Sequence, residues 1–229
     1  MDAMNRMRRR VILTSVLIIM FVFPAARGEG GEADDVLAGM EGFWSSVETF
    51  SADFRQEKRL ALFTDTIYST GTLIFQKPDR MLWKYDPPDD TIMSLSPGKV
   101  MFYFPGLNQA KIVYLTGEDD VSTVAPMGFG MGGGMEEMKD RFSVTVHRNG
   151  ETVEVTFTPK ERGEGDTVEK VVIRVDEAYM PIATAFYETT GDVTELLFSN
   201  QEINIPLDEE IFTIEPPPGT SIETIGAGE

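Results

Sequence analysis

The chain has 229 residues, no cysteine, one histidine and a formal net charge of −18. This length predicts one domain with a core of ordinary size, and the missing cysteine excludes disulfides. The acidic excess disfavours nucleic acid and anionic lipid head groups as partners, because both repel it. The acidic excess has two explanations, and both stay open. It serves solubility alone, or it keeps a soluble shuttle from adhering to the membranes it visits.

Residues 1–28 have the parts of a cleaved secretory signal peptide. Four arginines precede an uncharged apolar stretch at 11–23, and small residues then allow cleavage after Ala26 or Gly28. The alternative, a membrane anchor, needs about 20 apolar residues, and this stretch is shorter. We therefore expect residues 29–229 to form one exported domain. Without residues 1–28 the chain holds 15 basic and 37 acidic residues, a net charge of −22, and it lacks the cysteine that lipid-anchored lipoproteins acylate.

Residues 34–50 are expected to form an amphipathic helix that lies across a sheet. Asp34 or Asp35 suits its first turn, where acidic groups meet the positive end of the helix dipole. The apolar residues recur at spacings of three and four, which places them on one face: Val36, Leu37, Met40, Phe43, Trp44 and Val47.

Short strands are expected along the rest of the chain. Asn149-Gly150 and Thr190-Gly191-Asp192 are hairpin turn signals. In residues 71–115, short apolar stretches alternate with turn sequences, which indicates consecutive antiparallel strands. These strands contain no recognisable catalytic group, so we expect them to bind a hydrophobic ligand. The expected strands are 50–54, 81–85, 91–96, 99–104, 111–115, 142–148, 152–159, 168–176, 182–189 and 194–199, a pattern typical of an all-β barrel or sandwich.

Residues 121–140 interrupt this pattern because they are rich in glycine and methionine. Glycine frees the backbone, and methionine is an adaptable apolar side chain. The segment is either a disordered loop or a mobile flap over a cavity, and we interpret it as the flap. Its apolar side chains are Met127, Phe129, Met131, Met135 and Met138.

No pattern of catalytic residues stands out, so we expect neither an enzyme nor a cofactor or metal. Gly128, Gly130 and Gly133 match G-x-G-x-x-G but lack its strand–helix context. His147 could act in a Ser-His-Asp triad, but the G-x-S-x-G motif of a nucleophile elbow is absent from the sequence. We expect no zinc site from one histidine and no cysteine. The acidic groups 86–90 and 118–120 lack EF-hand spacing. The two carboxylates of a glycoside hydrolase are paired by their distance in space and not by a sequence spacing, so this class of enzyme stays open.

The order of the motifs resembles the periplasmic outer-membrane lipoprotein carrier family, LolA, over nearly the whole mature region. The matching segments are 50–56 (FSADFRQ), 71–73 (GTL), 77–79 (KPD), 81–85 (MLWKY), 88–90 (PDD), 98–99 (GK), 102–105 (FYFP), 109–110 (QA), 157–160 (FTPK) and 212–217 (FTIEPP). The resemblance implies a mainly β fold, an incomplete, strongly curved antiparallel β-barrel. Its apolar cavity would be covered by a helical or flexible lid.

The resemblance also implies a function without covalent chemistry. A periplasmic monomer would accept acylated lipoproteins from an inner-membrane ABC transporter complex and deliver them to an acceptor lipoprotein at the outer membrane. Two alternatives stay open: a carrier of another lipid, and a lipoprotein-sensing regulatory module of the same fold. The sensing role often brings an added C-terminal domain, and the chain stops soon after its last strand signal, so we favour the carrier.

Specific residues are expected to form the acyl-chain site. The apolar wall is assigned to Phe54, Phe75, Met81, Trp83, Tyr85 and Phe102, although strand alternation does not say whether their face looks inward. The family commonly has a lid-latching arginine where this chain has Lys77, which lacks the planar fork of arginine. Arg80 lies nearby and is expected to face solvent. Lys77 and the glycines of 128–134 together predict a looser lid.

Overall fold

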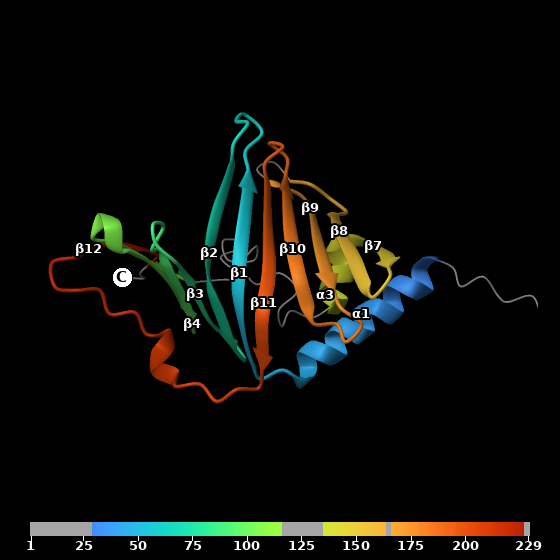
Figure 1. Ribbon diagram of the computed structural model, residues 1–229, viewed down its shortest axis with the longest axis horizontal. Coiled ribbons are helices and arrows are strands. Elements are labelled where there is room, and N and C mark those ends of the chain that lie inside the picture. The colour runs from blue at the N-terminus through green and yellow to red at the C-terminus, as the bar shows by residue number, and fades with distance from the viewer. Residues whose placement is uncertain (1–28, 116–134, 164–165, 227–229) are drawn as a thin grey trace, which may run out of the picture.

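Twelve strands form a single open sheet in the computed structural model, which describes residues 29–115, 135–163 and 166–226. The strands lie in the order β12-β6-β5-β4-β3-β2-β1-β11-β10-β9-β8-β7 (Figure 1). Neighbours are antiparallel except β12 and β6, which are parallel. Because β12 and β7 form free edges, the barrel is incomplete, and the expected fold class is confirmed.

The strand bounds agree closely with expectation for most of the chain. They are β1 Thr49–Arg59, β2 Thr66–Gln76, β3 Arg80–Tyr85, β4 Ile92–Ser96, β5 Lys99–Phe104, β6 Gln109–Tyr114, β7 Phe142–Asn149, β8 Thr152–Pro159, β9 Val168–Val175, β10 Pro181–Glu188, β11 Val193–Ile203 and β12 Ser221–Ile225. Gly150 has a φ of +61°, as the predicted Asn-Gly turn requires. The strands expected at 50–54 and 194–199 are too short, because β1 and β11 pair along most of their lengths.

The expected helix at 34–50 has both ends wrong. Helix α1 spans Glu29–Ser46, so Asp34 lies inside it, and Phe50 belongs to β1. Val47 and Phe50 continue the helical spacing, but they lie after the helix. They are apolar because both side chains are buried where the chain passes from α1 into β1. A second helix, α3, spans Met135–Arg141. No helix in the described ranges is long and apolar enough to span a bilayer.

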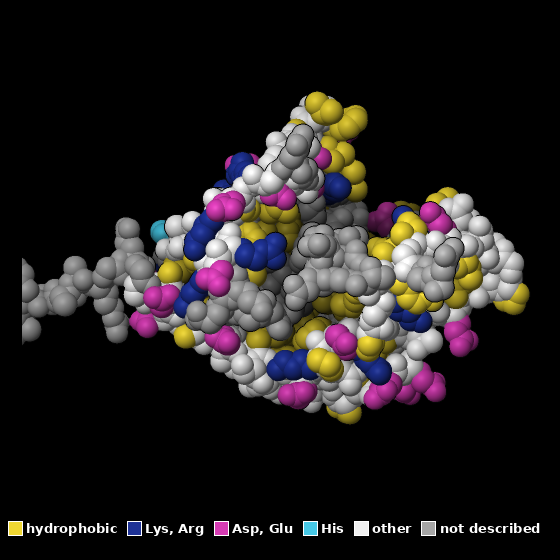
Figure 2. Space-filling view, turned by 180° about the vertical axis from the view of Figure 1, so that it is seen from behind, with side chains coloured by type: hydrophobic (Ala, Val, Ile, Leu, Met, Phe, Trp, Pro, Cys, Tyr) yellow, Lys and Arg dark blue, Asp and Glu magenta, His cyan; other side chains and the backbone are white. Residues whose placement is uncertain are grey.

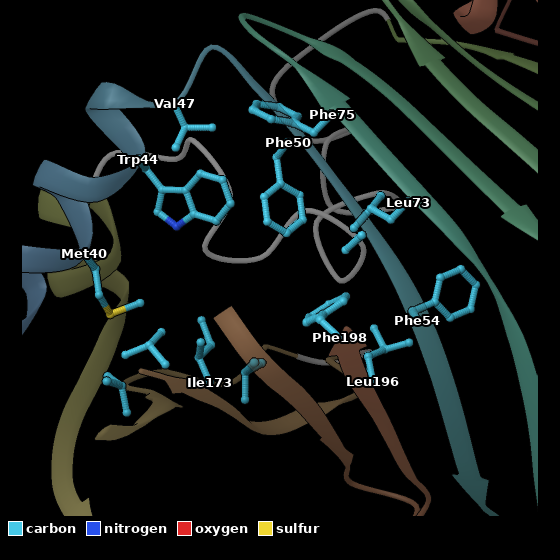
Figure 3. Packing of buried hydrophobic residues seen from close by; sticks show 14 of the residues in the cluster. Met40, Trp44, Val47, Phe50, Phe54, Leu73, Phe75, Ile173, Leu196 and Phe198 are labelled. Atoms are coloured by element: carbon cyan, nitrogen blue, oxygen red, sulfur yellow. The ribbon is translucent and has the colours of Figure 1, made fainter. Parts of the chain in front are cut away.

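The core lies between α1 and one face of the sheet, which we call the inner face. Figure 3 shows side chains from α1, from β1 and β2, and from the β9–β11 side pointing toward one another. Phe50, Leu73 and Phe157 are completely buried. Strands from both halves of the sheet thus contribute to one cluster, which the right-handed twist and curvature of a large antiparallel sheet allow.

The C-terminal segment crosses back to the far edge of the sheet (Figure 1). A 3-10 turn, η3 (Glu209–Phe212), packs on β3 and β4, and Phe212 is 2% exposed. Buried Ser94 donates its hydroxyl to the Phe212 carbonyl. The segment then ends in β12, which the sequence suggested only as an extended strand or tail.

Candidate functional site

The six predicted wall residues all lie on the inner face. Met81, Trp83 and Tyr85 alternate along β3, and pairing across the sheet aligns Trp83 with Leu73 on β2 and Met93 on β4. The same row continues to Phe102 on β5. Phe54, Phe75, Met81 and Trp83 are buried in the core cluster, while Tyr85 and Phe102 pack against it partly buried.

A glycine makes room for the aromatic side chains at the centre of this wall. Gly71 on β2 pairs with Phe54 on one side and Tyr85 on the other. The Phe54 ring crosses above it, with ring centroids 5.1 Å from Tyr85 and 5.0 Å from Trp83. A Cβ at Gly71 would lie 2.1 Å from the Lys84 carbonyl oxygen and 2.7 Å from the Phe54 ring. This close approach explains why the motif begins with glycine.

Tyr85 carries the one hydroxyl group of the wall. Its hydroxyl donates a 2.8 Å hydrogen bond to Oε1 of Gln56. Burial raises the pKa of Tyr85 to about 12; contact with the Trp83 side chain acts in the opposite direction, and the charge of Asp89 adds to the rise. The hydroxyl therefore stays neutral at any physiological pH.

Two hollows among the described residues, about 310 and 270 Å³, lie beside the turn that follows β3, and Tyr85 is the only wall residue that lines either of them. Arg55, Asp86 and Asp89 line the larger hollow, so a ligand there would meet charged side chains. On α1, the Trp44 ring lies 5.6 Å from Phe50 and 6.3 Å from Phe75, in edge-to-face contacts that close the wall at that end.

Lys77 holds the C-terminal end of α1. Its Nζ donates to the carbonyl oxygens of Trp44, at 2.6 Å, and Ser45, at 3.1 Å. Helix α1 has no basic residue in its own last turn, so Lys77 supplies a cation to the negative end of the helix from the β2–β3 turn. Asn204, which follows β11, donates to the Ser46 carbonyl at 3.0 Å and accepts from the Glu48 amide at 2.7 Å.

The predicted lid residues lie partly outside the described residues. That holds for Met127, Phe129 and Met131, and for the side chain of Met135, whose backbone begins α3. Met138 packs against the core cluster. Lys139 of α3 forms a 3.0 Å ion pair with Asp34 of α1, which links the two helices.

The remaining residues singled out from the sequence are scattered. Arg80, expected to face solvent, is 30% exposed and pairs with Glu209 at 3.1 Å. His147 is exposed on edge strand β7. In the described ranges, no three His, Asp or Glu side chains gather as metal ligands would. The acidic group 118–120 and the glycines 128–134 lie outside those ranges.

Sequence reasoning missed the parts of the site that depend on distant contacts. It placed Trp44 on the apolar stripe of a helix, but it gave no sign that the ring closes the β1–β2 end of the wall. The role of Asn204 is not predicted by the sequence either. The only local signal for Asn204 is that asparagine tolerates the left-handed backbone it adopts, with a φ of +55°.

Comparison of the sequence with known proteins finds outer-membrane lipoprotein carrier proteins. The family model described as outer membrane lipoprotein carrier protein LolA matches residues 45–215. An outer-membrane lipoprotein carrier protein of Pseudomonas paraeruginosa (strain DSM 24068 / PA7) is 25% identical over 206 residues, 89% of this chain and 96% of the relative. One from Pseudoalteromonas translucida (strain TAC 125) is 24% identical over 214 residues, 86% and 90% of the two chains.

A solved structure supports the fold alone. The crystal structure of an uncharacterized conserved protein from Thermus thermophilus superposes with a TM-score of 0.53 at 12% identity. The match covers 84% of this chain and 99% of that one.

Proposed function

This chain belongs to the LolA family of outer membrane lipoprotein carrier proteins, and from this premise we propose that it carries lipoproteins through the periplasm to the outer membrane. The observation that supports the proposal most directly is the inner face. An open sheet presents a continuous wall of aromatic and aliphatic side chains, with no catalytic group among the six predicted wall residues. A carrier needs such a wall and forms no covalent bond with its cargo.

The energetics of acyl chains require a container of this kind. Exposing one chain of about a dozen methylenes to water costs roughly 10 kcal/mol, at about 0.8 kcal/mol for each methylene. Contact with the wall formed by Phe54, Trp83 and Phe102 replaces that exposure. A carrier must also release its cargo, so its apolar surface should be adaptable rather than tightly complementary to one ligand.

The position of Trp44 favours entry of cargo by a movement of α1. The Trp44 ring contacts Phe50 and Phe75, so an acyl chain that reached these side chains would take the place of Trp44. We assign α1 and α3 the role of the helical lid, with Met138 as an adaptable contact. Lys77 is the latch of this lid, because it bonds the carbonyl of Trp44 itself.

The cycle needs partners at both membranes. An inner-membrane ABC transporter would load the carrier with energy from ATP hydrolysis, and an acceptor lipoprotein at the outer membrane would unload it. Residues 1–28 would direct export and be removed, which N-terminal sequencing of the purified protein tests. The exported chain would act as a monomer.

A transfer assay tests the carrier function. Inner-membrane vesicles that contain the donor transporter and an acylated lipoprotein are incubated with the exported chain and ATP. We expect a soluble complex of carrier and lipoprotein that does not form without ATP. If the lipoprotein stays in the vesicles, the proposal fails. Native mass spectrometry of the protein from its own periplasm then reports the bound mass, and a phospholipid or glycolipid mass would favour the alternative lipid carrier.

A quenching experiment tests the wall residues themselves. The exported chain holds two tryptophans, Trp44 and Trp83, so Trp44→Phe leaves Trp83 as the only indole. A lipoprotein with brominated acyl chains should quench Trp83 fluorescence on complex formation, because bromine quenches only on close approach. The same cargo without bromine is the control. A soluble complex with an unquenched Trp83 would place the acyl chains elsewhere.

A further inference from the structure

The turn between β1 and β2 carries the most exposed apolar side chains of the described residues. This turn, residues 60–65, is called the hairpin tip here. Leu62 is 91% exposed and Phe63 is 68% exposed. Figure 1 shows the β1–β2 hairpin projecting beyond the body of the sheet, and Figure 2 shows hydrophobic side chains at the end of that projection. Adjacent large apolar residues in water at a projecting point indicate an interaction site.

The hairpin tip is braced rather than loose. The Phe63 amide donates to the Leu60 carbonyl at 3.0 Å, which closes a tight turn. The Ala61 amide donates to Oδ1 of Asp192 at 2.8 Å, so the neighbouring β10–β11 hairpin supports the turn from the side. The two apolar side chains are therefore held outward in advance, and binding through them orders little additional chain.

The charge of the β1–β2 hairpin itself differs from that of the rest of the protein, although the Asp192 carboxylate of the neighbouring hairpin lies beside the tip. Residues 55–68 contain three basic and two acidic residues, in a chain whose net charge is −22 after residues 1–28 are removed. Lys58 and Arg59 immediately precede the tip, and Tyr68 behind it is 60% exposed. Apolar side chains at the end, followed by basic and aromatic ones, match the layers of a membrane interface.

We propose that the hairpin tip inserts Leu62 and Phe63 into the surface of a phospholipid bilayer. Lys58 and Arg59, the last two residues of β1 before the tip, would then lie at the depth of the head groups. The acidic body stays off the anionic surface while the tip touches it, which gives a shuttle a brief and oriented contact. The competing partner is a membrane protein with a groove that accepts the tip. We favour the bilayer because Lys58 and Arg59 directly precede the tip, where the lipid head groups would contact them.

Flotation with protein-free vesicles of phosphatidylethanolamine and a minor share of phosphatidylglycerol tests the proposal. Leu62→Ser with Phe63→Ser should lower the partition coefficient of the exported chain at least about a hundredfold, the lower bound for burying two such side chains. Leu107 is the matched control, since it is 67% exposed in the turn η1 (Pro105–Leu107) between β5 and β6. Leu107→Ser should leave partitioning unchanged.

A site-specific probe gives a second readout that does not depend on a weakened variant. The chain has no cysteine, so Leu62→Cys and Leu107→Cys each accept a single environment-sensitive fluorophore. Only the label at 62 should shift to the blue with vesicles. The proposal is overturned if the wild-type chain ignores pure lipid and binds only vesicles that contain membrane proteins, or if the label at 62 stays in water. No cargo enters either assay, so failure here leaves the carrier function untouched.

Discussion

At Tyr85, burial sets a limit on the alkaline stability of the protein. The pKa of Tyr85 is raised to about 12, above the ordinary value of 10.0. The folded state thus favours the neutral hydroxyl, and the stability that this group contributes is fully present below about pH 10. As the pH rises from about 10 toward 12, unfolding releases a proton, and about 2–3 kcal/mol of folding free energy should be lost.

The Tyr85→Phe variant isolates this effect from other groups that titrate at high pH. It lacks the hydrogen bond to Gln56, so it should be about 1 kcal/mol less stable than the wild type below pH 10. Urea unfolding at a series of pH values should show this advantage of the wild type shrinking and then reversing toward pH 12. A constant difference across that range would show that Tyr85 is not buried as described.

Gly71 tests how closely the wall is packed. Gly71→Ala would push a methyl group against the Lys84 carbonyl and the Phe54 ring, and the backbone carbonyl cannot rotate away. We expect a loss of about 1–3 kcal/mol in urea unfolding, the usual range for overpacking. Gly106→Ala is the matched control, because nothing lies within 4 Å of a Cβ there. Equal effects at both positions would argue against the close approach at Gly71.

At the scale of the element, α1 shows what local sequence patterns reveal and what they hide. Its apolar stripe was predictable because residues spaced by three and four share a helix face. Its C-terminus was not, since the groups that end it come from far away. Lys77 is 32 residues from Ser45, and Asn204 is 158 residues from Ser46. Nothing in the sequence near Ser46 records either partner.

The contacts of Lys77 predict a local change in α1. Lys77→Met keeps most of the stem but removes the charge and both hydrogen bonds to the helix carbonyls, which should cost about 1–2 kcal/mol. Amide hydrogen exchange in the last turns of α1 should accelerate more than exchange in β8 or β9. Lys77→Arg should restore protection, because the guanidinium also donates to carbonyls.

Exposed Lys99, at the start of β5, provides the control for Lys77. Lys99→Met changes the net charge equally but should leave exchange in α1 unaltered. If both variants accelerate exchange alike, charge alone is responsible and the latch is excluded. If only Lys77→Met does so and also releases cargo faster, α1 acts as the lid.

At the scale of the whole molecule, the order of the strands exceeded what the sequence could predict. Alternation identified which residues of β3 share a face, but not which strand lies beside it. The pairing of β1 with β11 joins segments far apart in the chain, and the parallel pairing of β12 with β6 has no turn to signal it. That Met81, Trp83 and Tyr85 share one face was predictable from alternation. The packing of Phe75 against Trp44 was not.

The acidic excess of the whole molecule predicts how salt affects its stability. A net charge of −22 after removal of residues 1–28 makes the compact state repel itself, since folding brings the carboxylates together. The surface ion pairs, such as Arg148 with Glu32, oppose this weakly, because exposed pairs contribute about 0–1 kcal/mol. Raising NaCl from about 10 to 200 mM shortens the Debye length from about 30 Å to under 10 Å. The melting temperature should therefore rise by several degrees.

Removing carboxylates should imitate that effect of salt. Glu151, Glu161 and Glu177 are exposed, so changing all three to glutamine disturbs no packing. The triple variant should melt at a higher temperature than the wild type at low salt and should respond less to added NaCl. Should salt instead lower the melting temperature, specific ion pairs would outweigh the general repulsion. The charged residues would then stabilise the fold, and its acidity would need no explanation from outside the molecule.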